Sequence, residues 1–143
     1  MSRVLPDPST LFGERVAQRL REEPILWLTT IGADGTPQPN PIWFLWVGGD
    51  SIMMYSKADA YRLAHIKRNP KVALHFNADS SGNDIIVFTG EAHISPDEPS
   101  PDKVAAYTEK YRDSIAGSFQ TPENFARLYP TPVRITLTKV RGF

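Results

Sequence analysis

The chain has 143 residues, 41% hydrophobic and 22% charged, which is the size and composition of a single globular domain. Lysine plus arginine and aspartate plus glutamate number 16 each, so no net field favours nucleic acid or an acidic membrane surface as a partner. Cysteine is absent, which excludes disulfides and thiolate sites, and no apolar run suggests a membrane span or signal core, so we expect a cytoplasmic protein.

We expect one domain over residues 1–143, in which residues 1–8 form an N-terminal tail. The first periodic segment, residues 9–23, predicts an amphipathic helix that lies against the rest of the fold. Phe12, Val16 and Leu20 recur every four residues and therefore share one face of this helix.

The pattern then changes to that of strands. Residues 25–31 are dense in strand-forming side chains and lead to Asp34 and Gly35, a pair that supplies the positive φ angles of a tight hairpin turn. The return strand is expected at residues 38–47, and residues 41–47 contain no polar side chain. A strand in a sheet with one solvent-exposed face would alternate polar and apolar side chains. One face of this strand should therefore fill the core, and the other should be covered by a partner chain or a ligand.

The rest of the chain predicts further short strands separated by helices. Strands are expected at residues 51–57, 72–76, 84–95 and 132–140, and helices at residues 59–69 and from Ser100 and Thr121 onward. The total is six strands in meander-like order. We therefore predict a mainly β fold with short helices, a closed or nearly closed six-stranded antiparallel barrel.

The junction of the third strand and its helix, residues 55–62, is the first candidate site. A strand that leads into a helix N-terminus presents free backbone N–H groups and the positive end of the helix dipole, which suit a phosphate. Ser56 can donate a hydroxyl, and Lys57 and Arg62 can bring two cations. Strand alternation puts Tyr55 and Lys57 on the face opposite Ser56. In isolation, the pattern is more typical of Lys57 and Arg62 as solvated surface charges.

The apolar strand is the second candidate. Trp43, Phe44 and Trp46 can form a wall for a planar ring, while Asn40 and nearby backbone groups bind its polar edge. The same residues also fit a simple packing role in a core and dimer interface.

Other kinds of site lack support in the sequence. The three histidines, His65, His75 and His93, are too widely spaced for a metal motif, so we expect no metal. No nucleophile elbow, P-loop or Rossmann fingerprint occurs, and no acid–base constellation is visible, so we assign no catalytic residue. This absence agrees with chemistry carried by an organic cofactor.

Residues 28–44, LTTIGADGTPQPNPIWF, resemble the opening hairpin of the pyridoxamine 5′-phosphate oxidase-like split barrels. The segments YSK, YRL, NPKVAL and TGEA follow at the spacing of that family, and the chain closes on RIT and RGF. The resemblance covers roughly residues 10–143. The short length of the chain and its PIWF sequence at residues 41–44 are most similar to the actinobacterial flavin/deazaflavin oxidoreductases of the B group.

The resemblance implies an FMN-binding split β-barrel that forms a homodimer, with two cofactor sites between the subunits. It implies that the ring of coenzyme F-420, or alternatively of FMN, lies between the residues Asn40, Pro41, Ile42 and Trp43. The ribityl chain and phosphate are then held by Tyr55, Ser56, Lys57, Ala60, Tyr61 and Arg62. Tyr61 departs from the oxidases of this superfamily, which usually carry a basic residue there, and this departure argues against tight FMN binding.

The function that the resemblance implies is an oxidoreductase, in which reduced coenzyme F-420 gives hydride to a small electron-poor organic acceptor. One alternative is an FMN-binding oxidase or reductase of the same fold. A second is a non-catalytic module that binds a flavin or a tetrapyrrole such as haem or biliverdin. The substrate residues of the pyridoxamine phosphate oxidases are not recognisable, so we do not expect that activity.

Overall fold

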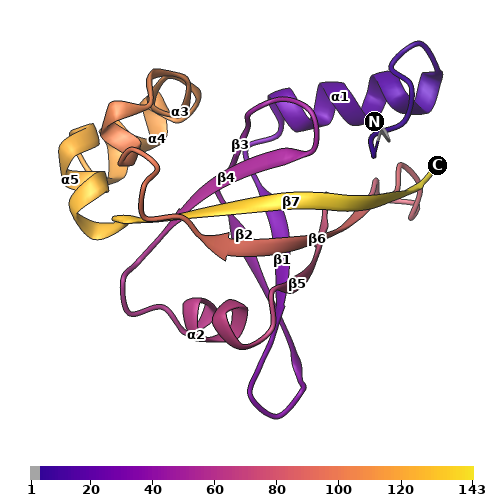
Figure 1. Ribbon diagram of the computed structural model, residues 1–143. Coiled ribbons are helices and arrows are strands. Elements are labelled where there is room, and N and C mark those ends of the chain that lie inside the picture. The colour runs from indigo at the N-terminus through magenta and orange to yellow at the C-terminus, as the bar shows by residue number, and fades with distance from the viewer. Residues whose placement is uncertain (1–3) are drawn as a thin grey trace.

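The computed structural model describes residues 4–143, in which a single antiparallel sheet curls into a half-barrel (Figure 1). Its strands are β1 (Leu26–Ile31), β2 (Pro37–Ile42), β3 (Leu45–Trp46), β4 (Ser51–Ser56), β5 (Lys71–His75), β6 (Ile86–Ile94) and β7 (Thr131–Gly142). The helices are α1 (Leu11–Glu22), α2 (Tyr61–Arg68), α3 (Ala105–Lys110), α4 (Arg112–Ser118) and α5 (Pro122–Leu128), with a 3-10 turn at Pro101–Lys103. None of the helices in the described part of the chain is long and apolar enough to cross a membrane.

The strand order is β2-β1-β5-β6-β7-β4-β3, so the predicted meander is wrong. The chain leaves β4 through α2 and enters β5 beside β1, and β7 then returns between β6 and β4. The sheet has seven strands rather than the predicted six, because the return strand expected at residues 38–47 divides into β2 and β3 at Trp43 and Phe44.

The division of that strand has a cause far along the chain. The Phe44 N–H donates to the Tyr111 hydroxyl over 2.8 Å, and Lys110 Nζ donates to the Phe44 carbonyl oxygen over 2.8 Å. The Tyr111 hydroxyl in turn donates to the Pro24 carbonyl oxygen over 2.7 Å. Side chains at the end of α3 thus satisfy backbone groups that a continuous strand would pair with its neighbour.

Lys110 makes the stability of this contact dependent on pH. Burial lowers the pKa of Lys110 from 10.5 to about 8, against a smaller opposing effect of Glu23. Below pH 8 the amine is protonated in the folded and unfolded states, so its burial cost is constant. Between pH 8 and 10.5 the unfolded chain keeps a proton that the folded chain has released, so the free energy of unfolding should rise with pH.

We expect this rise in the wild type relative to Lys110→Met, whose side chain has similar length and no charge. Urea unfolding of both proteins at pH 7, 8, 9 and 10 measures the difference. In the variant the Phe44 carbonyl oxygen loses its lysine donor, but the Tyr111 hydroxyl lies 3.1 Å away and can turn its one proton to it from the Pro24 carbonyl oxygen. A difference that stays constant from pH 8 to pH 10 would contradict the lowered pKa.

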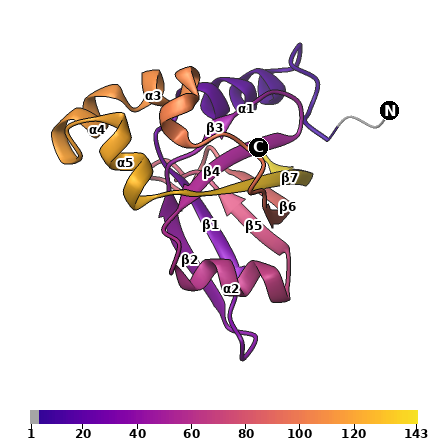
Figure 2. The ribbon, with the colours of Figure 1, turned by 60° about the vertical axis from the view of Figure 1, so that its left-hand side comes forward.

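The strand β4 lies between two apolar clusters. Ile52 and Met54 point into the half-barrel, where they pack with side chains from every long strand and with Val16 and Leu20 of α1. Met53 and Tyr55 point the other way, into a mainly aromatic cluster formed with the helices α3, α4 and α5. These three helices gather at one side of the sheet, beside the start of β7 and apart from α2 (Figures 1 and 2).

The aromatic cluster corrects one expectation about residues 41–47. Trp43 and Leu45 lie partly buried against it, while Phe44 points into the half-barrel core. The face that was expected to need a partner chain or ligand is thus covered in part by the chain's own helices. The periodicity of a strand cannot reveal such cover, because the covering residues lie about 65 to 80 positions later.

The hairpin of β1 and β2 extends beyond the rest of the sheet (Figure 1). Gly35 alone takes a positive φ in its turn, at 86°. Residues 37–41 are all exposed, on both faces of β2, and β2 is an edge strand that pairs only with β1. Prolines occupy alternate positions of this strand, at residues 37, 39 and 41.

The predicted N-terminal tail, residues 1–8, lies partly outside the described residues. From Val4 onward it packs on the fold, since Val4 and Leu5 contact the half-barrel core. The helix α1 follows, with the Thr10 hydroxyl accepting the Gly13 N–H over 3.0 Å as its N-cap. A Cβ at Gly13 would lie 1.9 Å from the Asp7 carbonyl oxygen, so the close approach of the Asp7 backbone to α1 requires glycine at this position.

Candidate functional site

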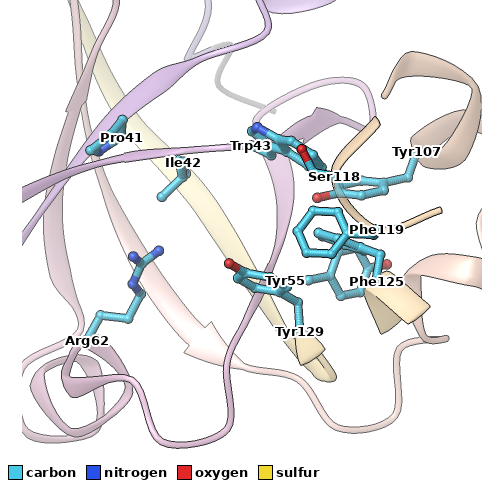
Figure 3. Close-up of a pocket in the computed structure, with 10 residues that line it drawn as sticks. All are labelled: Pro41, Ile42, Trp43, Tyr55, Arg62, Tyr107, Ser118, Phe119, Phe125 and Tyr129. Atoms are coloured by element: carbon cyan, nitrogen blue, oxygen red, sulfur yellow. The ribbon is translucent and has the colours of Figure 1, made fainter. Parts of the chain in front are cut away.

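Two neighbouring pockets meet at Arg62. The first, which we call the aromatic pocket, has a volume of about 330 Å³ and lies between β4 and the helical layer (Figure 3). It is lined by Pro41, Ile42, Trp43, Tyr55, Arg62, Tyr107, Ser118, Phe119, Phe125 and Tyr129. The second, the polar pocket, has a volume of about 610 Å³ and is lined by Gln38, Asn40, Ala60, Tyr61, Arg62 and His65.

Arg62 is a half-buried cation without an anionic partner. It belongs to the first turn of α2, and burial lowers the pKa of its guanidinium, with Tyr129 opposing the shift. Within residues 4–143 it makes no hydrogen bond and no ion pair. Because a desolvated cation is stabilised by an anion, Arg62 is well suited to bind a negatively charged group of a ligand.

The N-terminus of α2 adds to this preference. Its N-cap is Ala60, which provides no side-chain bond, and the first turn holds no acidic residue. The first N–H groups of the helix are therefore free of side-chain partners and carry the positive end of its dipole. An anion at Arg62 would lie close to these groups, as the sequence predicted for the strand–helix junction.

His65 lies on the next turn of α2, at the wall of the polar pocket. Its Nδ1 is 2.8 Å from the hydroxyl of the buried Thr30, which fixes the ring and leaves Nε2 for other contacts. In the part of the chain that the structure describes, no three His, Cys, Asp or Glu side chains gather as a metal site would require.

The structure brings eight of the ten predicted cofactor residues to the two pockets. The aromatic pocket takes Pro41, Ile42, Trp43, Tyr55 and Arg62, and the polar pocket takes Asn40, Ala60 and Tyr61 along with Arg62. Ser56 and Lys57 line neither pocket. Whether these residues bind a cofactor stays a prediction.

Ser56 and Lys57 lie beside the site rather than in it. Ser56 is buried, and its hydroxyl donates to the Lys57 carbonyl oxygen over 3.1 Å. Lys57 is exposed, with Nζ 5.6 Å from the centroid of the Tyr129 ring. Since Tyr129 also lines the aromatic pocket, Lys57 lies close to the mouth of this pocket. It can contribute positive charge there while its side chain stays exposed to solvent.

The predicted wall of three aromatic side chains is reduced to Trp43. Phe44 fills the half-barrel core, and Trp46 packs near the N-terminal segment in a different pocket. The Trp43 ring stacks on Tyr111 at 4.5 Å and on Phe125 at 5.3 Å between centroids. These rings of the same chain fix the orientation of Trp43 at the aromatic pocket.

Sequence reasoning missed half of the aromatic pocket. Tyr107, Ser118, Phe119, Phe125 and Tyr129 all come from the segment of helices α3 to α5 and the residue after it. Three of the five tyrosines of the chain fall within residues 107–129, a concentration that could have marked this segment. A cluster of aromatic side chains on short helices needs an apolar surface to cover, and β4 provides it.

The chain is similar to a known protein family and to several solved structures. A family model described as pyridoxamine 5′-phosphate oxidase matches residues 12–139. Among solved structures, an F420 reductase is 25% identical, covers 87% of this chain and 94% of its own, and superposes with a TM-score of 0.65. No curated protein sequence matches the chain.

Two further solved structures share the fold at lower identity. The conserved hypothetical protein Rv2991 from Mycobacterium tuberculosis is 21% identical, with 99% of this chain and 86% of that chain covered and a TM-score of 0.71. The haem storage protein HutZ from Vibrio cholerae is 13% identical, with 90% and 92% covered and a TM-score of 0.62. At these identities the likeness concerns the fold alone.

Proposed function

Because the chain belongs to the pyridoxamine 5′-phosphate oxidase family, we propose that it is an oxidoreductase that uses a flavin-type coenzyme, the deazaflavin coenzyme F-420. In this proposal reduced coenzyme F-420 gives hydride to a small electron-poor organic acceptor. The observation that carries the proposal is the position of Arg62, an unpartnered cation between a polar pocket and an aromatic one. A ligand with a phosphate at one end and a planar ring at the other matches this arrangement.

The residues at each end would have distinct tasks. Arg62 and the first N–H groups of α2 would hold the phosphate, with Lys57 adding positive charge at the mouth. Pro41, Ile42 and Trp43 would pack against the ring in the aromatic pocket. When bound, the deazaflavin supplies hydride from its C5 atom, and the protein orients the ring and excludes water from it.

Two observations favour coenzyme F-420 over FMN. Tyr61 stands where the oxidases of the superfamily usually carry a basic residue. Because tyrosine carries no positive charge, it adds no second cation to the site, and it is 85% exposed. The F420 reductase is also among the structures with the same fold, at 25% identity. FMN-dependent oxidase or reductase chemistry is the alternative within the same site.

We also propose that the working form is a homodimer, in which a second copy covers β2. Residues 37–41 are exposed on both faces of this strand, and Asn40 and Pro41 border the two pockets. A strand exposed on both faces is stabilised when another surface packs on it. A partner there would close the pockets from the side that this chain leaves open.

A binding titration tests the proposed function. The purified protein is titrated separately with coenzyme F-420, FMN and haemin, and binding is followed by fluorescence for the first two and by the Soret band for the third. Preference for F-420 is expected. Preference for FMN would replace F-420 by FMN as the proposed coenzyme. Binding of haemin alone would indicate a non-catalytic haem carrier, with His65 as the candidate axial ligand at the polar pocket.

A further inference from the structure

The Tyr107 hydroxyl is a polar group at the wall of the aromatic pocket that the proposed function does not use. The side chain of Tyr107, on α3, is only 1% exposed and lines the aromatic pocket. Its hydroxyl oxygen points into the pocket, on the side opposite Arg62 (Figure 3). No residue from Val4 to the C-terminus forms a hydrogen bond with it.

The Tyr107 ring is held rigidly by its neighbours. Its centroid lies 5.0 Å from that of Tyr55, 5.1 Å from that of Tyr111 and 5.9 Å from that of Phe125. The hydroxyl is thus fixed in place before any ligand arrives, which reduces the entropy lost on binding. Burial raises the pKa of Tyr107, so the phenol is neutral and keeps its proton at physiological pH.

A hydroxyl that faces a pocket and has no partner within the protein is free to donate to an acceptor on a ligand. The walls of the aromatic pocket are flat rings, from Phe119, Phe125 and Tyr129, and its opposite end carries the cation of Arg62. A ligand that satisfies all of these groups is planar, carries an oxygen acceptor, and bears a negative charge. The Tyr55 hydroxyl is already engaged, since it donates to the Pro99 carbonyl oxygen over 3.1 Å, whereas Tyr129 interacts with Arg62 at the other end of the pocket.

We propose that Tyr107 donates a hydrogen bond to a carbonyl oxygen of a planar conjugated ring in the aromatic pocket, and so selects rings that carry this oxygen. The inference rests on the proposed function, which supplies the expectation of such a ring, and deepens it by naming the recognised group. The ring belongs either to the coenzyme or to its organic acceptor, since both classes contain conjugated carbonyl compounds.

Calorimetric titration with two matched probes tests this assignment. The probes are anthraquinone-2-sulfonate and anthracene-2-sulfonate, which share a flat three-ring frame and an anionic group and differ by two carbonyl oxygens. The wild type should bind the quinone about fivefold to tenfold more tightly, the value of one hydrogen bond. Tyr107→Phe removes only the hydroxyl, so it should bind both probes equally and keep the anthracene affinity within about twofold.

Unfolding measurements provide the control. Tyr107→Phe should not lower the free energy of unfolding of the free protein, because the hydroxyl it removes has no partner there. Equal affinities in the wild type, binding of neither probe, or a quinone preference that persists in Tyr107→Phe would each overturn the proposal.

Repeating the titration on protein saturated with coenzyme F-420 identifies the source of the ring. Competition assigns the pocket to the coenzyme ring, and undiminished quinone binding assigns it to the acceptor. Either result supports the role of Tyr107. Failure of F-420 to bind, with the quinone preference intact, would refute the coenzyme rather than the Tyr107 contact, so the two failures are distinct.

Discussion

Replacing Phe125 with alanine is expected to lower the free energy of unfolding by about 3–5 kcal/mol. Phe125 is 3% exposed and stacks on Trp43 at 5.3 Å and on Tyr129 at 4.9 Å between centroids. It also meets Phe119 and Tyr107 at 5.1 Å and 5.9 Å. Removing its ring leaves a cavity at the centre of the contact between α5 and β4, and urea unfolding measures the loss.

Leu128→Ala is the matched control for this experiment. Leu128 lies on the same helix, and its side chain is 51% exposed, so its truncation should change the free energy of unfolding by about 0.5 kcal/mol or less. A loss below about 1 kcal/mol for Phe125→Ala would mean that the helical layer does not depend on this ring. The aromatic pocket would then need other support.

Replacing Arg62 with glutamine should weaken coenzyme F-420 binding by about tenfold to a hundredfold. A charge-assisted hydrogen bond to a phosphate contributes about 1.5–3 kcal/mol, and each 1.4 kcal/mol corresponds to a factor of ten in affinity. Arg62 is half-buried, so solvent screens this interaction less than at the surface. Fluorescence titration of the variant at constant ionic strength measures the effect.

Arg68→Gln makes the same chemical change on the same helix, outside both pockets. Arg68 is exposed and donates weakly to the Ile31 carbonyl oxygen over 3.4 Å, so its replacement should leave the coenzyme affinity within about twofold. Equal losses in the two variants would show that the net charge of α2, and not a contact of Arg62, attracts the coenzyme. An unchanged affinity of Arg62→Gln would remove it from the site.

The local elements of the fold could be predicted from the sequence, but their assembly could not. Alternating side chains and turn residues located six strands to within a few residues but did not separate β3 from β2, and Pro24 and Pro122 mark a helix end and a helix start. The division of the return strand depends on Lys110 and Tyr111, which contact Phe44 from 66 and 67 positions away. No pattern around Phe44 itself contains that information.

The candidate site divides in the same way. Arg62 and residues 41–43 belong to local motifs that were read as two separate candidate sites, and only the family resemblance assigned both to one cofactor; the structure brings them to one pocket. Tyr107 and Phe125 reach the same pocket only because α3 and α5 pack on the outer face of β4. Their role depends on tertiary packing, which a single sequence does not display.

The alternate prolines of β2 have a consequence for how this protein can associate. Residues 37, 39 and 41 are paired with Ile31, Thr29 and Trp27 of β1, and proline cannot donate to a neighbouring strand. Those three residues must therefore turn their backbone away from β1, so the outer edge of β2 offers carbonyl oxygens and no N–H donors along residues 37–41. Such an edge accepts but cannot donate ladder hydrogen bonds, so it is a poor template for another strand, and the chain can expose this arm to a partner's side chains with less tendency to edge-to-edge aggregation.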